Sequence, residues 1–453
     1  MTFSPAPDTD HLRAAVREVL PSVRADLEAL VRIPSVSADP ARAADVRLSA
    51  EATADLFGAE GFDDVRILAA GTGAPAVVAR RPAPAGAPTV LLYAHHDVQP
   101  VGDPADWDSE PFEPTERGDR LYGRGAADDK AGIAAHLAAI RAHGEDLPVG
   151  VTVLVEGEEE VGSPTLEAFL AEYQDLLAAD VIVIADSGNW DIGEPALTTS
   201  LRGLVDCFVE VRTLDHGVHS GMWGGVVPDA VTTMVRLLAT LHDDEGNVAV
   251  EGLHSGPAAD VEYPVDRVRA ESGITDGVQL IGSGSVVERL WTKPAIATIG
   301  FDATRTADAS NTLIPSVRAK LSVRLAPGDS SAQAMDRLRE HLEKHVQWGA
   351  QLTFTPGEYG EPTQIDATGP AYDAARAAFR DAWDGVEPVD MGVGGSIPFI
   401  AAFNEAFPDA AVLVTGVEDP DTRAHGANEG LHLAEFERVC LAEALLLRNL
   451  ADR

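Results

Sequence analysis

The chain of 453 residues is poor in cysteine: it contains only Cys207 and Cys440, which lie far apart in the sequence. A disulfide framework of the secreted type is therefore not expected, and we expect a reducing, cytoplasmic environment. No apolar run approaches the ~18 residues that span a bilayer, so a membrane protein is not expected. The N-terminal stretch MTFSPAPDTDHLRAAV lacks a basic segment followed by an apolar one, and we expect no signal peptide.

Basic residues are also scarce, with 34 lysines and arginines against 73 acidic residues and a net charge of −39. This balance argues against nucleic acids and anionic membranes as partners. Most of the carboxylates are expected to form a solvated surface, and only a handful are needed for chemistry. Hydrophobic residues make up 45% of the chain, which allows a large core and suggests two or three domains.

Two kinds of strand pattern predict an interrupted α/β fold. Continuous apolar runs at 89–94, 149–156, 179–186 and 410–417 predict strands buried on both faces of a mostly parallel sheet. Amphipathic patterns predict helices at 9–32, interrupted at Pro21, and at 42–60 and 130–143. The middle of the chain instead predicts partly alternating strands at 204–212, 295–302, 317–326 and 350–357, with helices at 229–242 and 332–346.

These patterns predict a discontinuous catalytic domain, 1–203 plus 361–453, built on an open sheet with helices on both faces. The middle segment, 204–360, is predicted to be an inserted α+β domain of the ferredoxin-like type, with one sheet face covered.

Histidine and acidic residues follow the ends of the predicted parallel strands, where an open α/β sheet builds its site. His95 and Asp97 come directly after strand 89–94. Residues two apart in an extended segment point the same way, so His95 can bind a metal while Asp97 orients a neighbouring group. His96 points to the opposite face. Taken alone, this pair fits a structural histidine equally well.

Further carboxylates occur in LYGRGAADDKAG and VEGEEEVGS. Asp128 and Asp129 precede the helix at 130–143, where an aspartate is a common N-cap, although a carboxylate there can also bridge two cations. Glu158, Glu159 and Glu160 follow strand 149–156. Three adjacent carboxylates repel one another unless a cation or water compensates, and the alternative is a solvated acidic turn.

The complete set contains two histidines and several carboxylates but no cysteine, which suits zinc, cobalt or manganese. A centre with two ions ~3.5–4 Å apart needs one bridging carboxylate and two terminal ligands for each ion. Five residues meet that requirement: His95, Asp128, Glu160, Asp186 and His425. Glu159 then remains as the general base.

The motifs YAHHDVQP, GRGAADDKAG, EGEEEVGS, HSGMWGG, NTLIP, GGSIP and HGANE resemble, in order and spacing, a family of zinc-dependent amide hydrolases. This family contains carnosinases and related dipeptidases, aminoacylases, acetylornithine deacetylase, succinyl-diaminopimelate desuccinylase and glutamate carboxypeptidases. The resemblance runs from about residue 27 to the C-terminus. The dipeptidase branch is the nearest, by DVQP, HSGMWGG and GGSIP.

The resemblance implies two divalent ions, most simply Zn²⁺, with Co²⁺ or Mn²⁺ as alternatives. His95 and Asp186 would hold one ion, Glu160 and His425 the other, and Asp128 would bridge them. Asp97 would support His95, and Glu159 would take a proton from a water that bridges the metals. The substrate would be held by Arg324, Asn311, Gly394, Gly395 and Ser396. The inserted domain would act as a lid and form a homodimer in which His219 reaches the partner's site as an oxyanion donor.

Three features of the sequence qualify this resemblance. HSG occurs twice, and because only His219 is followed by Gly-Gly and a helical run, His254 is expected in a surface loop. Ala94 replaces the usual glycine. Gly392 and Val393 stand where dipeptidases of this type carry Arg-Glu, whose glutamate could pair with the substrate amine. The expected function is hydrolysis of dipeptides; the alternatives are an N-acyl-amino-acid deacylase or carboxypeptidase and, less favoured, a non-catalytic metal-binding protein.

Overall fold

The chain folds as two compact units, seen in a computed structural model that describes residues 7–257, 260–395 and 398–451. The first unit comprises Met1–Thr199, Ile365–Met391 and Pro398–Arg453, and the second comprises Ser200–Gln364 and Gly392–Ile397. The unit boundaries at 199/200 and 364/365 lie four residues from the predicted domain limits. The short segment Gly392–Ile397 groups with the second unit, which the sequence did not suggest.

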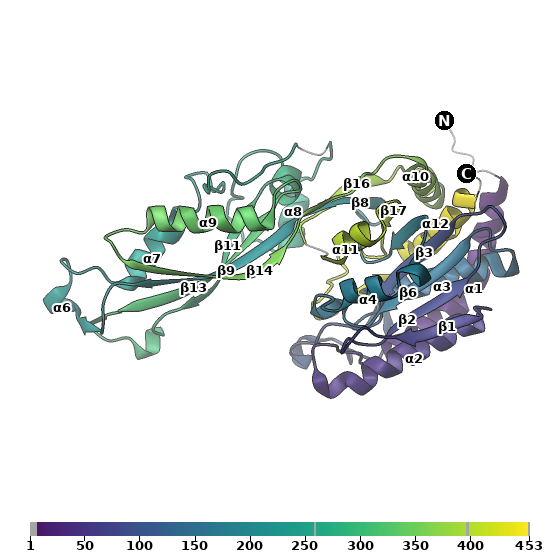
Figure 1. Ribbon diagram of the computed structural model, residues 1–453, viewed down its shortest axis with the longest axis horizontal. Helices are drawn as coiled ribbons and strands as arrows, with labels where there is room; N and C mark the ends of the chain where they lie inside the picture. Colours follow the sequence, from purple (N-terminus) through teal and green to yellow (C-terminus); the bar gives the residue numbers. More distant parts are fainter. Residues whose placement is uncertain (1–6, 258–259, 396–397, 452–453) are drawn as a thin grey trace. The chain divides into compact units, whose positions relative to one another are not determined.

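The first unit is a mixed α/β fold on a mainly parallel central sheet (Figure 1). The sheet has the strand order β1 (Asp64–Leu68), β2 (Ala76–Arg81), β6 (Gly150–Glu156), β3 (Thr89–His95), β7 (Val181–Ile184), β17 (Ala411–Val414), β8 (Ala196–Leu201) and β15 (Thr363–Gln364), and β16 (Val389–Val393) also pairs with β8. All of β15 and the last two residues of β8 and of β16 are counted with the second unit. The four central strands, β6, β3, β7 and β17, are parallel. They are almost entirely buried, as the continuous apolar runs predicted.

Helices and a small sheet complete this unit. The helices are α1 (Pro7–Val31), α2 (Ala43–Ala59), α3 (Lys130–His143), α4 (Leu166–Glu172), α5 (Gln174–Leu177), α10 (Pro370–Ala382), α11 (Pro398–Ala406) and α12 (Leu433–Ala451). Strands β4 (Thr115–Arg117), β5 (Arg120–Tyr122) and β18 (Gly430–His432) form the small sheet. Helix α3 packs on β3 and between α1 and α12, and so fixes the segment that precedes it against the edge of the main sheet.

The second unit has an antiparallel sheet in the order β11 (Ala295–Asp302), β13 (Ser316–Leu325), β9 (Gly203–Arg212) and β14 (Gln351–Gly360). Helices α7 (Ala230–Ala239) and α9 (Ser331–His345) cover one face with an apolar core, to which β9 contributes every second residue from Val205 to Val211. The remaining elements are α6 (Ser220–Trp223), α8 (Val265–Ser272) and the short strands β10 (Val218–His219) and β12 (Thr312–Leu313).

One predicted interruption is wrong. Helix α1 continues through Pro21, which is exposed, so water can solvate the carbonyl that the proline leaves without a partner. The two cysteines are free and buried. Within the described parts of the chain, no helix is both long and apolar enough to cross a membrane.

Candidate metal centre and active site

The parallel strands of the first unit bring their carboxyl ends to one edge of the sheet, where three of the predicted ligands lie: His95, Glu160 and Asp186. Strand β3 ends at His95, which lies opposite Glu156 at the end of β6. Strand β7 lies on the other side of β3, and Asp186 follows it after one residue. The ligand types therefore meet because adjacent parallel strands end together.

Asp128 lies between the two histidines. Its Oδ1 is 3.1 Å from His95 Nε2, and its Oδ2 is 3.1 Å from His425 Nε2. His425 Nε2 is also 3.3 Å from a carboxylate oxygen of Glu160. On the other side, His95 Nε2 lies 3.9 Å from Asp186 Oδ1 and 4.0 Å from Glu159 Oε2. One carboxylate thus offers a different oxygen to each imidazole, with further carboxylates beyond.

Two groups of donors are close enough to hold an ion: His95 with Asp128 and Glu160, and His95 with Glu159 and Asp186. The ligand donors in each group lie within 4.8 Å of one another. This grouping differs from the predicted ligand assignment in three respects: it places Glu159 beside Asp186 among the donors, it joins Glu160 to His95, and it does not include His425. His425 approaches the first group through Asp128 and Glu160.

Asp97 holds both the histidine and the glutamate turn. His95 Nδ1 is 3.0 Å from the Asp97 carbonyl oxygen and 3.5 Å from its Oδ1, which leaves Nε2 facing Asp128. The Asp97 carboxylate accepts hydrogen bonds from the backbone N–H groups of Glu159 (3.2 Å) and Glu160 (3.1 Å). His96 points away, with Nε2 2.8 Å from the Pro75 carbonyl. A buried carboxylate that orients a ligand imidazole is typical of metal sites.

The three adjacent glutamates have different environments. Glu158 is buried and accepts hydrogen bonds from Thr165 N (2.8 Å), Thr165 Oγ1 (2.6 Å) and Ala74 N (2.8 Å), so it stabilises the turn. Glu160 accepts from Gln99 N at 3.0 Å and from Gln99 Nε2 at 2.8 Å. Within the described residues, no hydrogen bond reaches the carboxylate of Glu159. Gln99 was not predicted, although it lies in the DVQP motif.

The charges around His95 are those of a cation site. Burial, followed by the charge of Asp186, raises the pKa of Glu159 to about 9. Burial also raises the pKa of Asp186 to about 7, with added repulsion from Asp128 and Glu160. Hydrogen bonds to Asp128 and Glu160 raise the pKa of His425 to about 11. More negative charge converges here than two imidazoles neutralise, which fits binding of divalent cations.

Asp129 has the capping role that was the alternative to metal binding. It is the N-cap of α3, where its Oδ1 accepts from Gly132 N at 3.2 Å, and its Oδ2 accepts from His95 N at 3.2 Å. A Cβ at Gly132 would lie 2.3 Å from Asp129 Oδ1, so this contact requires glycine. The Asp128–Asp129 peptide bond is cis.

A buried ion pair, which the sequence analysis missed, joins the two loops that carry Asp128 and His425. Glu429 Oε2 accepts from Arg124 Nη1 (2.7 Å) and Gly125 N (3.0 Å), and its Oε1 accepts from Ala127 N (2.9 Å) and Asp128 N (3.1 Å). Arg124 Nη2 also donates to the carbonyl of Gly426, next to His425, at 3.1 Å. Glu429 lies in the HGANE motif, but its partner is about 300 residues away.

The remaining predicted residues belong to the second unit. His219 ends β10, is exposed, and accepts from Gly221 N at 3.0 Å. Asn311 lies beside it, since its carbonyl accepts from Ser220 N at 2.8 Å. Arg324 on β13 is opposite Leu204 of β9.

The glycine loop and the second HSG motif also lie in this unit. The carbonyl of Gly394 accepts from Arg202 Nε at 3.4 Å, and Gly395 follows it. Ser396 lies outside the described residues. His254 lies in an exposed loop, as expected.

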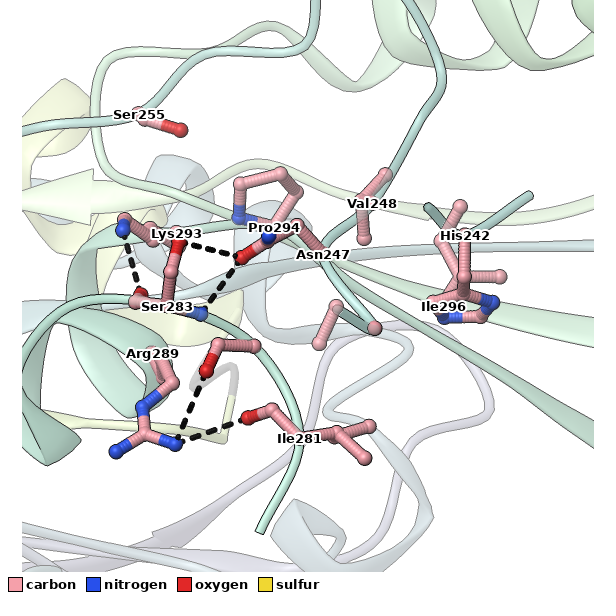
Figure 2. Close-up of a pocket in the computed structure, with 13 residues that line it drawn as sticks. His242, Asn247, Val248, Ser255, Ile281, Ser283, Arg289, Lys293, Pro294 and Ile296 are labelled. Atoms are coloured by element: carbon pink, nitrogen blue, oxygen red, sulfur yellow. Dashed lines mark hydrogen bonds between the residues drawn. The ribbon is translucent and has the colours of Figure 1, made fainter. Parts of the chain in front are cut away.

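A cavity of about 310 Å³ in the second unit contains none of these residues (Figure 2). Four of its polar residues bond to one another or to nearby backbone: Asn247 Oδ1 accepts from Ser283 N at 2.8 Å, Lys293 Nζ donates to the Ser283 carbonyl at 2.9 Å, and Arg289 donates to the Ile281 carbonyl at 2.9 Å. No polar group among these converges on the cavity, so we do not include it in the candidate site.

Comparisons with known proteins agree with these motifs. The sequence model of peptidase family M20/M25/M40 matches residues 91–449. The cysteinylglycine-S-conjugate dipeptidase of Corynebacterium striatum is 36% identical over 367 residues, which cover 80% of this chain and 81% of that protein.

Two solved structures share the fold over nearly the whole chain. Human carnosine dipeptidase 1 has a TM-score of 0.80 at 25% identity and covers 99% of this chain and 100% of its own. The dipeptidase Dug1p of Saccharomyces cerevisiae has a TM-score of 0.80 at 23% identity, with coverage of 98% and 99%.

Proposed function

The chain belongs to peptidase family M20/M25/M40, and on that premise we propose that it hydrolyses the amide bond of dipeptides that carry a free carboxylate. The observation that carries the proposal is the position of Asp128 between His95 and His425, with Glu159 and Asp186 on the far side of His95. The similarity to the cysteinylglycine-S-conjugate dipeptidase of Corynebacterium striatum supports the substrate class.

Two divalent ions fit this donor set. Asp128, His95 and Asp186 would hold one ion, and Asp128, Glu160 and His425 would hold the other. Zn²⁺ is the simplest choice for nitrogen and oxygen donors without thiolates, and Co²⁺ or Mn²⁺ also fit. When bound, such ions supply a Lewis acid that polarises the scissile carbonyl and lowers the pKa of the attacking water.

Glu159 is the general base in this proposal. Glu158 and Glu160 are each held by several hydrogen bonds, whereas the carboxylate of Glu159 is held by none from the described residues. It lies 4.0 Å from His95 Nε2, at the ligand cluster, where it can accept a proton from water and return it to the leaving amine.

The second unit is proposed to be a ferredoxin-like lid that forms a homodimer. Its β9–α7–β11–β13–α9–β14 order, with β9 and β13 central in the sheet, supports this topology. Arg324 binds the substrate carboxylate, because a guanidinium forms bidentate pairs with carboxylates, and burial lowers its pKa without an acidic partner. Exposed His219, with Asn311 beside it, donates to the developing oxyanion in the partner's site.

An N-acyl-amino-acid deacylase is the second candidate. It is favoured by the lack of a charged side chain at Gly392 and Val393. A Cβ at Gly392 would lie 2.7 Å from Trp291 Cβ, so no longer side chain fits there. Val393 beside it carries no charge. Neither residue therefore offers a charged side chain that could pair with an ammonium group.

Hydrolysis of Ala- and β-Ala-dipeptides, measured beside N-acetyl amino acids, separates the two candidates. The proposal predicts cleavage of the free dipeptides. Activity confined to the acylated substrates would instead establish the deacylase.

A further inference from the structure

A dipeptidase must place the α-ammonium group of its substrate close to the catalytic centre, and this inference rests on the proposed function. The ammonium nitrogen is bonded to the carbon next to the scissile carbonyl, so its receptor has to lie beside Glu159 and the ligand cluster. Gly392 and Val393 cannot supply a charge. A carboxylate near the cluster that has no other role could supply it instead.

Glu418 has the required position. It follows β17 and forms a parallel bridge with Gly188, two residues after Asp186. The pairing is close: the Glu418 carbonyl accepts from Asn189 N at 2.8 Å, and Glu418 N donates to the Ser187 carbonyl at 3.3 Å. A Cβ at Gly188 would lie 3.1 Å from the Glu418 Cβ, so glycine allows this approach. Glu418 is thus fixed beside the strand end that carries Asp186.

The Glu418 side chain has no assigned partner. Across the parts of the chain that the structure describes, its carboxylate makes no hydrogen bond or ion pair. It also lies outside both groups of candidate ligands. Burial, and then the charges of Asp128 and Asp186, raise its pKa well above the usual value, so its carboxylate is within electrostatic reach of the centre. An ion pair with a substrate cation would relieve this repulsion.

We propose that Glu418 binds the α-ammonium group of the substrate and so makes the site prefer dipeptides with a free amino terminus to N-acyl amino acids. The carboxylate is positioned by the backbone pairing of Glu418 with Gly188, beyond the end of β17, rather than by the segment Gly392–Ile397. This role gives the chain an amine receptor in place of the glutamate that Val393 replaces.

The test compares Ala-Gly with N-propionylglycine, which has the same skeleton and leaving group but no ammonium. The Glu418→Gln variant should lower kcat/KM for Ala-Gly about 10- to 100-fold, as expected for loss of a charged hydrogen bond, and leave N-propionylglycine nearly unchanged. Glu418→Asp retains the charge on a shorter side chain. Its kcat/KM for Ala-Gly should lie between the values of the wild type and of Glu418→Gln. Asp421→Asn removes one exposed charge from the same loop and serves as the control.

Binding separates this inference from the proposed function. In the metal-loaded Glu159→Gln background, calorimetry should show the same selective loss of Ala-Gly affinity when Glu418→Gln is added. If the wild type cleaves neither substrate but Glu418→Gln still selectively lowers the affinity for Ala-Gly, the proposed dipeptidase function is refuted and the role of Glu418 stands. An unchanged preference between the substrates overturns the inference, and so does a Glu418→Gln protein that binds fewer ions with its preference intact.

Discussion

The buried pair of Glu429 and Arg124 gives the sharpest prediction about how the centre is held. Glu429 is completely buried and Arg124 is 1% exposed. Replacing Glu429 with Gln keeps the shape but removes the charge opposite Arg124 and turns an amide N–H₂ toward backbone donors. Breaking one side of a buried ion pair costs about 3–5 kcal/mol. We expect the free energy of unfolding of the metal-free protein to fall by that amount.

Urea titration followed by circular dichroism measures this loss. The matched control is Glu51→Gln, which breaks an exposed pair with Arg47 at 3.0 Å and should change stability by only about 0.5 kcal/mol. Since Glu429 also holds the loop of Asp128 against the loop of His425, metal affinity should drop about 10- to 100-fold, as for other partners of metal ligands. A Glu429→Gln protein as stable as the control, with unchanged metal affinity, would refute this reasoning.

Three further predictions follow from the site. Glu159→Gln should lower kcat by about 10²–10⁴-fold while bound metal, measured by elemental analysis, stays the same; unchanged turnover would remove Glu159 from its role. The raised pKa values of Glu159 (about 9) and Asp186 (about 7) mean that the metal-free native state retains protons that the unfolded chain loses above its ordinary carboxyl pKa. Its stability should therefore fall as pH rises from about 5 to about 9, and divalent metal should remove this loss; denaturation midpoints at pH 6 and 8.5 that do not differ would contradict the charge account. Mixing inactive His219→Ala and inactive Glu159→Gln proteins should restore partial activity by subunit exchange, and no recovery despite demonstrated exchange would exclude action in trans.

The sequence predicted what short-range patterns determine. Continuous apolar runs located β3 and β6 to within one residue, because a strand buried on both faces has no polar positions. The convergence of His95, Glu160 and Asp186 then followed from parallel strands ending together.

The sequence could not predict contacts made across long separations. Arg124 and Glu429 form an ion pair although they are about 300 residues apart in the sequence. Glu418 lies beside Gly188 because the segments that follow β7 and β17 pair with each other. Nothing in the local pattern of these residues distinguishes them from ordinary surface charges. The prediction of an interruption at Pro21 was wrong for the opposite reason: packing of α1 against α3 outweighed the local tendency of proline to interrupt a helix.

The central claim is that a two-ion centre around Asp128 hydrolyses dipeptides. The most direct test is to titrate metal-free protein with Zn²⁺ or Mn²⁺ while following both bound metal and Ala-Gly hydrolysis. The account predicts that activity reaches its plateau at two bound ions per chain and that Asp128→Asn abolishes both binding events. Full hydrolysis without metal, or unchanged metal binding in Asp128→Asn, would contradict it.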